Sequence, residues 1–129
     1  MDYPAVLAFW FDEIEPEAWW KKDVAFDRLL SSRFGAVHEM AAAGELSGWR
    51  ESGPGRLAEI IVLDQFSRNI HRDSARAFAC DGMALVLAQE AISSGADRNM
   101  NADQRACLTC TVSRHVYMNR QSSCSVLRA

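Results

Sequence analysis

The sequence predicts an all-α protein whose helices pair as antiparallel hairpins, stacked as a bundle or a short superhelix. Apolar residues recur every three or four positions along most of the chain, which is the period of an amphipathic helix. No stretch of four or more residues alternates between apolar and polar positions as a half-buried strand does. Short connections between successive helices favour antiparallel neighbours. With 129 residues, 49% of them hydrophobic, the chain suffices for one compact domain with a core.

The first half of the chain carries start and stop signals for two helices. Asp2 is a suitable N-cap for a first helix over residues 3–12. Asp23 is expected to cap a long helix, and Gly44 to end it in the left-handed conformation. Between that helix and the next, residues 46–49 predict a short helical turn.

In the second half, a glycine–proline–glycine break precedes a helix over residues 57–70. Apolar side chains surround much of its circumference, which predicts that it is the central, buried helix. Asp81 is expected to cap the next helix, which ends at Gly95. Asn101 followed by Gln104 has the form of a capping box and predicts a further helix start.

Charge and hydropathy exclude several partners. The chain has 14 basic and 17 acidic residues, a formal net charge of −3, which gives no electrostatic reason to bind a nucleic acid. No apolar run approaches the roughly 20 residues of a membrane helix, and the N-terminus lacks the cationic start of a signal peptide. We therefore expect no nucleic acid or membrane partner, and a cytoplasmic location.

Residues 57–69 read LAEIIVLDQFSRN, and this run resembles a bacterial family known as domain of unknown function 924. The resemblance covers about residues 5–106. It implies a helical fold similar to tetratricopeptide-repeat superhelices, without their repeat signature, and no established activity. Other matching motifs are Phe9-Trp10-Phe11, Trp19-Trp20-Lys21, Phe34-Gly35, Gly44-Glu45-Leu46, Arg72 and Ala77-Phe78-Ala79.

The last part of the chain departs from this family. After the arginine that matches Arg105, such proteins continue with an aromatic-rich stretch and a His-Ser-Glu motif, whereas residues 107–129 have neither and contain no acidic residue. We expect a single helical domain over residues 1–106 and an atypical, poorly ordered tail over residues 107–129, as a reading-frame change or truncation would produce. Missing helices would leave apolar surface uncovered, so we expect the chain to form homo-oligomers through it.

The tail also allows a metal-binding interpretation. Cys107, Cys110 and His115 have the opening spacing of a zinc knuckle, with Cys124 as the fourth ligand, and thiolates with imidazole form closed tetrahedral zinc sites. The last spacing is too long for a knuckle, and no glycine lies between Cys110 and Cys124. We therefore predict no metal or other cofactor and keep a zinc-binding tail as an alternative.

A polar cluster interrupts the apolar pattern of the central helix. Residues four apart share a helix face, so Asp64, Arg68 and Arg72 align, with Gln65 and Asn69 beside them. A carboxylate that enters a core needs a partner, and Arg68 can supply it. In the structural interpretation this ion pair fixes helix packing, while Gln65 and Asn69 satisfy nearby backbone groups.

In the functional interpretation the same residues line a cleft near the Leu63–Arg72 segment. The planar guanidinium group suits carboxylates and phosphates, so the expected partner is a small anionic ligand or an unidentified protein. An exposed tryptophan beside lysines would add a contact surface, whereas His38 is expected at the surface or its boundary. The ligand-binding candidates are Asp64, Gln65, Arg68, Asn69, His71, Arg72 and Trp20.

No linear catalytic motif is present: the chain lacks a nucleophile elbow, a phosphate loop, a zinc-protease motif and a dinucleotide fingerprint. The predicted function is therefore a binding or protein-interaction module rather than an enzyme. The alternative is a small-molecule enzyme of unknown reaction that uses the same cleft, because acid–base pairs assembled in space leave no linear signature.

Overall fold

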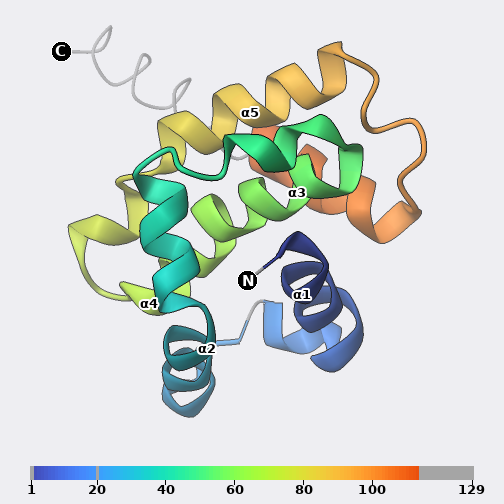
Figure 1. The fold of residues 1–129 in the computed structure, drawn as a ribbon. Helices are drawn as coiled ribbons and strands as arrows, with labels where there is room; N and C mark the ends of the chain where they lie inside the picture. Colours follow the sequence, from blue (N-terminus) through green and yellow to red (C-terminus); the bar gives the residue numbers. More distant parts are fainter. Residues whose placement is uncertain (1, 20, 114–129) are drawn as a thin grey trace, which may run out of the picture.

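The computed structural model describes residues 2–19 and 21–113, and this part of the chain is helical without any strand (Figure 1), which confirms the predicted all-α class. The tetratricopeptide-like arrangement stays a prediction. The α-helices are α1 (Tyr3–Ala8), α2 (Val24–Ala42), α3 (Gly53–Ile61), α4 (Ser67–Ile70) and α5 (Asp81–Ser93), and residues 102–113 are helical as well. The other elements are π-helical turns at Phe9–Glu13 and Val62–Phe66 and 3₁₀ turns at Pro16–Trp19, Ser47–Glu51 and Ala75–Phe78.

The predicted signals at the ends of the first helices are confirmed. Asp2 and Asp23 accept hydrogen bonds from backbone N–H groups at the starts of α1 and α2. Gly44 and Gly95 have φ angles of 76° and 79°, the left-handed region that a residue without Cβ adopts most easily. These local signals therefore set where α2 and α5 end.

Of the two helix caps predicted in the second half of the chain, the one at Asn101 is confirmed and the one at Asp81 is wrong. Asn101 and Gln104 exchange side chain-to-backbone hydrogen bonds of 2.9 and 3.0 Å, so the capping box is confirmed. Asp81 does not cap α5: the helix begins at Asp81 itself, after Cys80. Its carboxylate instead accepts a 3.1 Å hydrogen bond from Arg68 Nη2, because a cation on the neighbouring helix lies within reach.

The central helix is confirmed as the centre of the fold. Helix α3, the π-helical turn Val62–Phe66 and α4 follow one another without a break, and this run contacts α1, α2 and α5 (Figure 1). Leu57, Ile60, Leu63 and Phe66 are fully buried in it. A helix that is apolar on several sides needs neighbours on several sides, and here it has them.

Residues 102–113 form a helix, drawn in orange and red in Figure 1, that contacts the central helix through the hydrogen bond from Thr111 to Asp64. The helix continues past residue 107, where we expected helical periodicity to stop. Leu108 and Thr111, three residues apart on one face, are both buried and explain why it continues. The boundary between a domain over 1–106 and a tail over 107–129 stays a prediction, because residues 114–129 lie outside the described part.

Candidate functional site

Asp64 is the buried polar centre that the sequence predicts. Its side chain is fully buried, and Arg68 Nη1 donates to its Oδ1 at 2.8 Å. Gln65 Nε2 donates to Oδ2 at 3.1 Å, and Thr111 Oγ1 donates to the same oxygen at 3.0 Å. Since Arg68 also contacts Asp81, this group connects the central helix to α5 and to residues 102–113.

The outer end of the polar cluster binds a different carboxylate. Arg72 donates to Asp27 on α2 through Nε and Nη2, with the Nη2 to Oδ1 distance at 3.0 Å, and Asn69 Nδ2 donates to Oδ1 at 2.9 Å. Burial alone would raise the pKa of Asp27, but the hydrogen bonds from Arg72 and Asn69 outweigh burial and lower it.

The predicted roles of Gln65 and Asn69 as partners of backbone groups are therefore wrong. Both amides donate to carboxylates instead. The reason is that backbone groups inside a continuous helix already bond one another, whereas a carboxylate accepts several hydrogen bonds and needs donors when buried.

His38 is buried, with 4% of its surface exposed, and not at the surface as expected. Its Nε2 lies 2.7 Å from Ser67 Oγ, and that hydroxyl donates to Leu63 O at 2.6 Å. Since the hydroxyl has one hydrogen, His38 must be the donor in their contact. Ser67 is therefore not arranged as a nucleophile activated by a base.

His71 lies outside the carboxylate groups, with its ring centroid 5.2 Å from that of His38. Burial lowers the pKa of His38, and the nearby His71 and Arg76 lower it further. Burial also lowers the pKa of His71, with Arg76 as the next cause. The two imidazoles thus form a pair that favours the neutral state.

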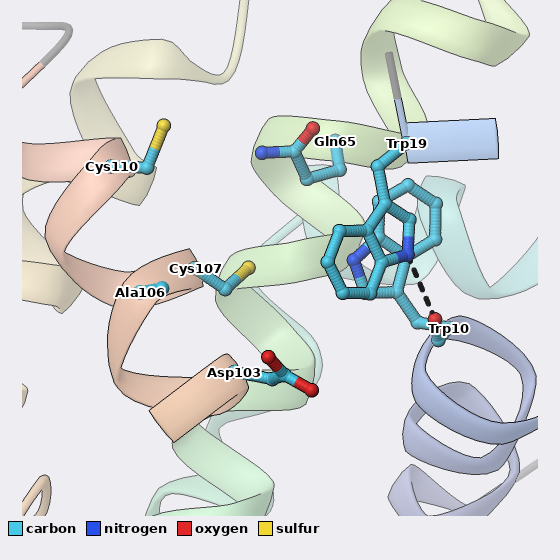
Figure 2. A pocket seen from close by; sticks show the side chains of 7 residues that line it. All are labelled: Trp10, Trp19, Gln65, Asp103, Ala106, Cys107 and Cys110. Atoms are coloured by element: carbon cyan, nitrogen blue, oxygen red, sulfur yellow. Dashed lines mark hydrogen bonds between the residues drawn. The ribbon is translucent and has the colours of Figure 1, made fainter. Parts of the chain in front are cut away.

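A cavity of about 240 Å³ lies between the N-terminal segment, the central helix and residues 102–113 (Figure 2). Of the predicted site residues, Gln65 lines it. Sequence reasoning noted the early tryptophans but gave residues 102–113 no part in this site, because nothing local in the sequence indicates which helix packs beside Gln65. The lining residues are Trp10, Trp19, Gln65, Asp103, Ala106, Cys107 and Cys110.

Two of the residues that line this cavity belong to π-helical turns. Trp10 belongs to the turn Phe9–Glu13 and Gln65 to the turn Val62–Phe66. Such widened turns redirect side chains and are frequent at functional sites. Trp19 Nε1 donates to Trp10 O at 2.9 Å, and the two indole rings stack at a centroid distance of 6.1 Å (Figure 2). The indoles therefore form a fixed apolar wall.

The opposite wall comes from one face of the helix at residues 102–113. Asp103, Ala106, Cys107 and Cys110 are spaced three and four residues apart, so they share that face (Figure 2). Asp103 is exposed and brings a negative charge to a cavity whose other lining residues are uncharged side chains or thiols. This arrangement suits a flat apolar molecule that carries a cationic or hydrogen-bond-donating group.

Asn69 and Arg72 line a second, open hollow of about 320 Å³. Its charged groups are the cations Lys22, Arg28 and Arg72 and the carboxylates Asp27 and Asp73. The predicted site residues are thus distributed: Gln65 faces the cavity, Asn69 and Arg72 face the hollow, and Asp64 and Arg68 connect helices. Trp20 lies outside the described residues.

Other predictions are only partly covered by the structure. In residues 2–19 and 21–113 no group of three or more His, Cys, Asp or Glu side chains is placed to hold a metal, while His115 and Cys124 lie outside that part. No helix there is long and apolar enough to cross a membrane. Self-association stays a prediction; among the residues that the structure describes, the large exposed apolar ones are Val24, Leu29, Met40, Phe78, Val86 and Ile92.

Comparison with known proteins places this chain in a family. The family model for a bacterial protein of unknown function, DUF924, matches residues 6–128, which includes most of the C-terminal segment. A solved structure of a protein of unknown function from Agrobacterium tumefaciens is similar at 37% identity with a TM-score of 0.79, over 84% of this chain and 61% of that one. No curated protein matches the chain. The chain therefore belongs to the DUF924 family of bacterial proteins of unknown function.

Proposed function

We propose that this domain is a small-molecule-binding module and that its ligand occupies the cavity beside Trp10 and Trp19. The observation that carries the proposal is the cavity itself: about 240 Å³, walled by segments far apart in the sequence, with a fixed indole pair on one side. A mostly apolar cavity with a few polar groups at its edge is the usual form of a small-ligand site. Two π-helical turns that place Trp10 and Gln65 there add support.

The lining residues define a ligand class. Indole faces favour a flat, aromatic or apolar body, and the Asp103 carboxylate favours a positive charge or a hydrogen-bond donor. Gln65 uses one amide hydrogen on Asp64, and in the described residues its amide has no other hydrogen bond, so its carbonyl oxygen can accept one from a ligand. The proposed ligand is a small aromatic amine or a similar amphipathic cation.

Binding is preferred to catalysis because the serine–histidine contact has the wrong donor direction for nucleophilic attack. The small anionic ligand predicted from the sequence is a second candidate. The observation that favours it is that Arg72, with Lys22 and Arg28, faces the open hollow. The two candidates differ in the sign of the ligand's charge and in its location.

Three probes that share a phenyl ring test the charge of the ligand: phenethylamine, 3-phenylpropanol and 3-phenylpropionate. Each is titrated against the full chain while tryptophan fluorescence is recorded. We expect saturable quenching, with the cation bound about three- to tenfold more tightly than the anion, because one partly solvated ion pair contributes on the order of 1 kcal/mol. No saturation with any probe, or tighter binding of the anion, would contradict the cavity proposal.

Matched variants test the location. Ala106→Leu fills the cavity from an exposed position on the 102–113 helix, whereas Ala102→Leu makes the same change one turn earlier, outside the lining. We expect the first to abolish phenethylamine binding and the second to leave it unchanged. Asp103→Asn should remove the preference for the cation, while Glu45→Gln, an exposed acid away from the lining, should not. Equal effects within either pair would place the ligand elsewhere.

A further inference from the structure

We infer that Arg33 on α2 is a positioning residue for the cavity: it holds the π-helical turn Phe9–Glu13 in the form that fixes the two indoles of the cavity wall. The importance of this wall for a ligand rests on the proposed function. The hold on the turn does not, because it can be measured without any ligand. The two proposals can therefore fail separately.

Arg33 reaches both ends of the turn from the neighbouring helix. Its guanidinium carbon lies 4.9 Å from the ring centroid of Phe9, the first residue of the turn, and 5.3 Å from that of Phe34. Its Nη1 and Nη2 donate to the two carboxylate oxygens of Glu13, the last residue, at 3.3 and 3.2 Å. A planar guanidinium can stack on a ring and bind a carboxylate at two points. One side chain therefore bridges the turn from its first residue to its last.

The hydrogen bonds of the turn show what its π-helical form does for the cavity. In an α-helix the Ile14 N–H would donate to the carbonyl of Trp10, four residues earlier. Here it donates to Phe9 O, five residues earlier, at 3.3 Å. The Trp10 carbonyl is thereby left for the Trp19 indole, whose Nε1 donates to it at 2.9 Å (Figure 2). The π-helical form of the turn thus fixes the stacked indoles.

Contacts outside the turn must favour this form, because π-helical turns are rare compared with α-helical ones. At its first residue, the ring of Phe9 is buried against three other phenylalanine rings. At its last residue, the side chain of Glu13 is 49% exposed and pairs with Arg33. Such an exposed ion pair contributes little to global stability. Its loss should therefore loosen the turn without unfolding the chain.

Hydrogen exchange of the Trp19 indole tests the hold on the turn. The indole N–H signals of the full chain are recorded by proton–nitrogen correlation NMR, and Trp19→Phe identifies the Trp19 signal. We expect Arg33→Gln to speed the exchange of this hydrogen about five- to tenfold, because an exposed ion pair and a cation–π contact each contribute modestly. Arg33→Lys keeps the charge but not the planar fork, so its exchange should be intermediate. Arg76→Gln, which removes another exposed arginine, should leave the exchange unchanged.

A backbone amide of the core separates a local effect from loss of the fold. Ile60 is fully buried in the central helix, so exchange of its amide should be the same in Arg33→Gln as in the wild type. If Arg33→Gln leaves the Trp19 exchange unchanged, the inference is wrong. Equal acceleration at Trp19 and Ile60 would overturn it as well, because Arg33 would then support the whole fold rather than the turn.

Phenethylamine titration of the same variants measures the effect on binding. Arg33→Gln should bind at least about twofold more weakly, and by no more than the factor by which the Trp19 exchange rises, because the ligand binds only to chains whose wall is in place. Wild-type affinity in Arg33→Gln despite faster Trp19 exchange would show that Arg33 does not position the site. A wild-type chain that fails to bind phenethylamine contradicts the proposed function, while the Trp19 exchange still decides whether Arg33 holds the turn.

Discussion

The carboxylates of Asp64 and Asp27 differ in their surroundings although their arginine partners, Arg68 and Arg72, lie only four residues apart. Asp64 is fully buried and accepts from Arg68 within its own helix. Asp27 comes from α2, keeps 13% of its side chain exposed and meets Arg72 at the edge of the open hollow. A polar stretch that reads as one cluster in the sequence is therefore two sites.

This difference indicates two roles for similar chemistry. The Asp64 group joins three segments, so it fixes the position of residues 102–113 and with them one wall of the cavity. The Asp27 group joins two helices beside solvent, where water can replace a lost partner. Burial, rather than the identity of the ion pair, determines what each contributes to stability.

The largest expected effect is on folding stability. Asp64→Asn should lower the free energy of unfolding by about 3–5 kcal/mol, because it leaves the Arg68 charge without its buried partner. Asp27→Asn should lower it by only about 1–2 kcal/mol, because a more exposed ion pair contributes less. Urea unfolding followed by circular dichroism measures both.

The arginine variants complete the comparison. Arg68→Ala should cost more stability than Arg72→Ala, since the first removes bonds to both Asp64 and Asp81. If Arg68→Ala weakens phenethylamine binding while stability stays unchanged, Arg68 has a ligand role and the structural interpretation of the inner group is wrong. Similar losses for both carboxylates would remove the distinction between the two sites.

Much of the fold could be predicted because its signals are local. Caps at Asp2 and Asp23, left-handed glycines and the capping box at Asn101 each depend on residues a few positions apart. The predicted cap at Asp81 is wrong because its carboxylate accepts from Arg68, which is 13 residues away in the sequence. Partners on other elements leave no trace in local spacing.

The site could be predicted only in part for the same reason. Asp64 stood out as a carboxylate in an apolar stripe, and its i to i+4 partner followed from helix geometry. Thr111 and Asp27 could not be found, since each reaches the central helix from an element more than 40 residues away. His38 lies on a mixed face of α2, and its burial depends on contact with Ser67.

A smaller effect is expected from pH at the histidine pair. The pKa of His38 is lowered from 6.5, so the native state favours the neutral ring and the unfolded chain binds protons first. The contribution of neutral His38 to the free energy of unfolding should therefore be fully present above pH 6.5. It should be lost as the pH falls through the pKa of the folded state. The charged or titratable groups near His38 are His71, Arg76 and Glu39.

His38→Gln tests this dependence, since its Nε2 can still donate to Ser67 but does not titrate. Urea midpoints measured between about pH 7.5 and 5.5 should fall less steeply in this variant than in the wild type. His71→Asn should have a weaker effect in the same direction, because this ring is less buried. If the urea midpoint of His38→Gln falls with pH as steeply as that of the wild type, groups other than His38 cause the pH dependence.

The smallest expected effect is the pH dependence of the contribution that Asp27 makes to stability. The hydrogen bonds from Arg72 and Asn69 outweigh burial and lower the pKa of Asp27 below its ordinary value of 3.8. The contribution of ionised Asp27 to stability is therefore present above pH 3.8 and is lost as the pH falls through the pKa of the folded state. Arg72→Gln removes the ion pair and should flatten the acid limb of the stability curve, whereas Arg28→Gln, in the same hollow, should not. If both variants keep the wild-type limb, Asp27 is not held by Arg72 in solution, and the outer pair has no measurable effect on stability.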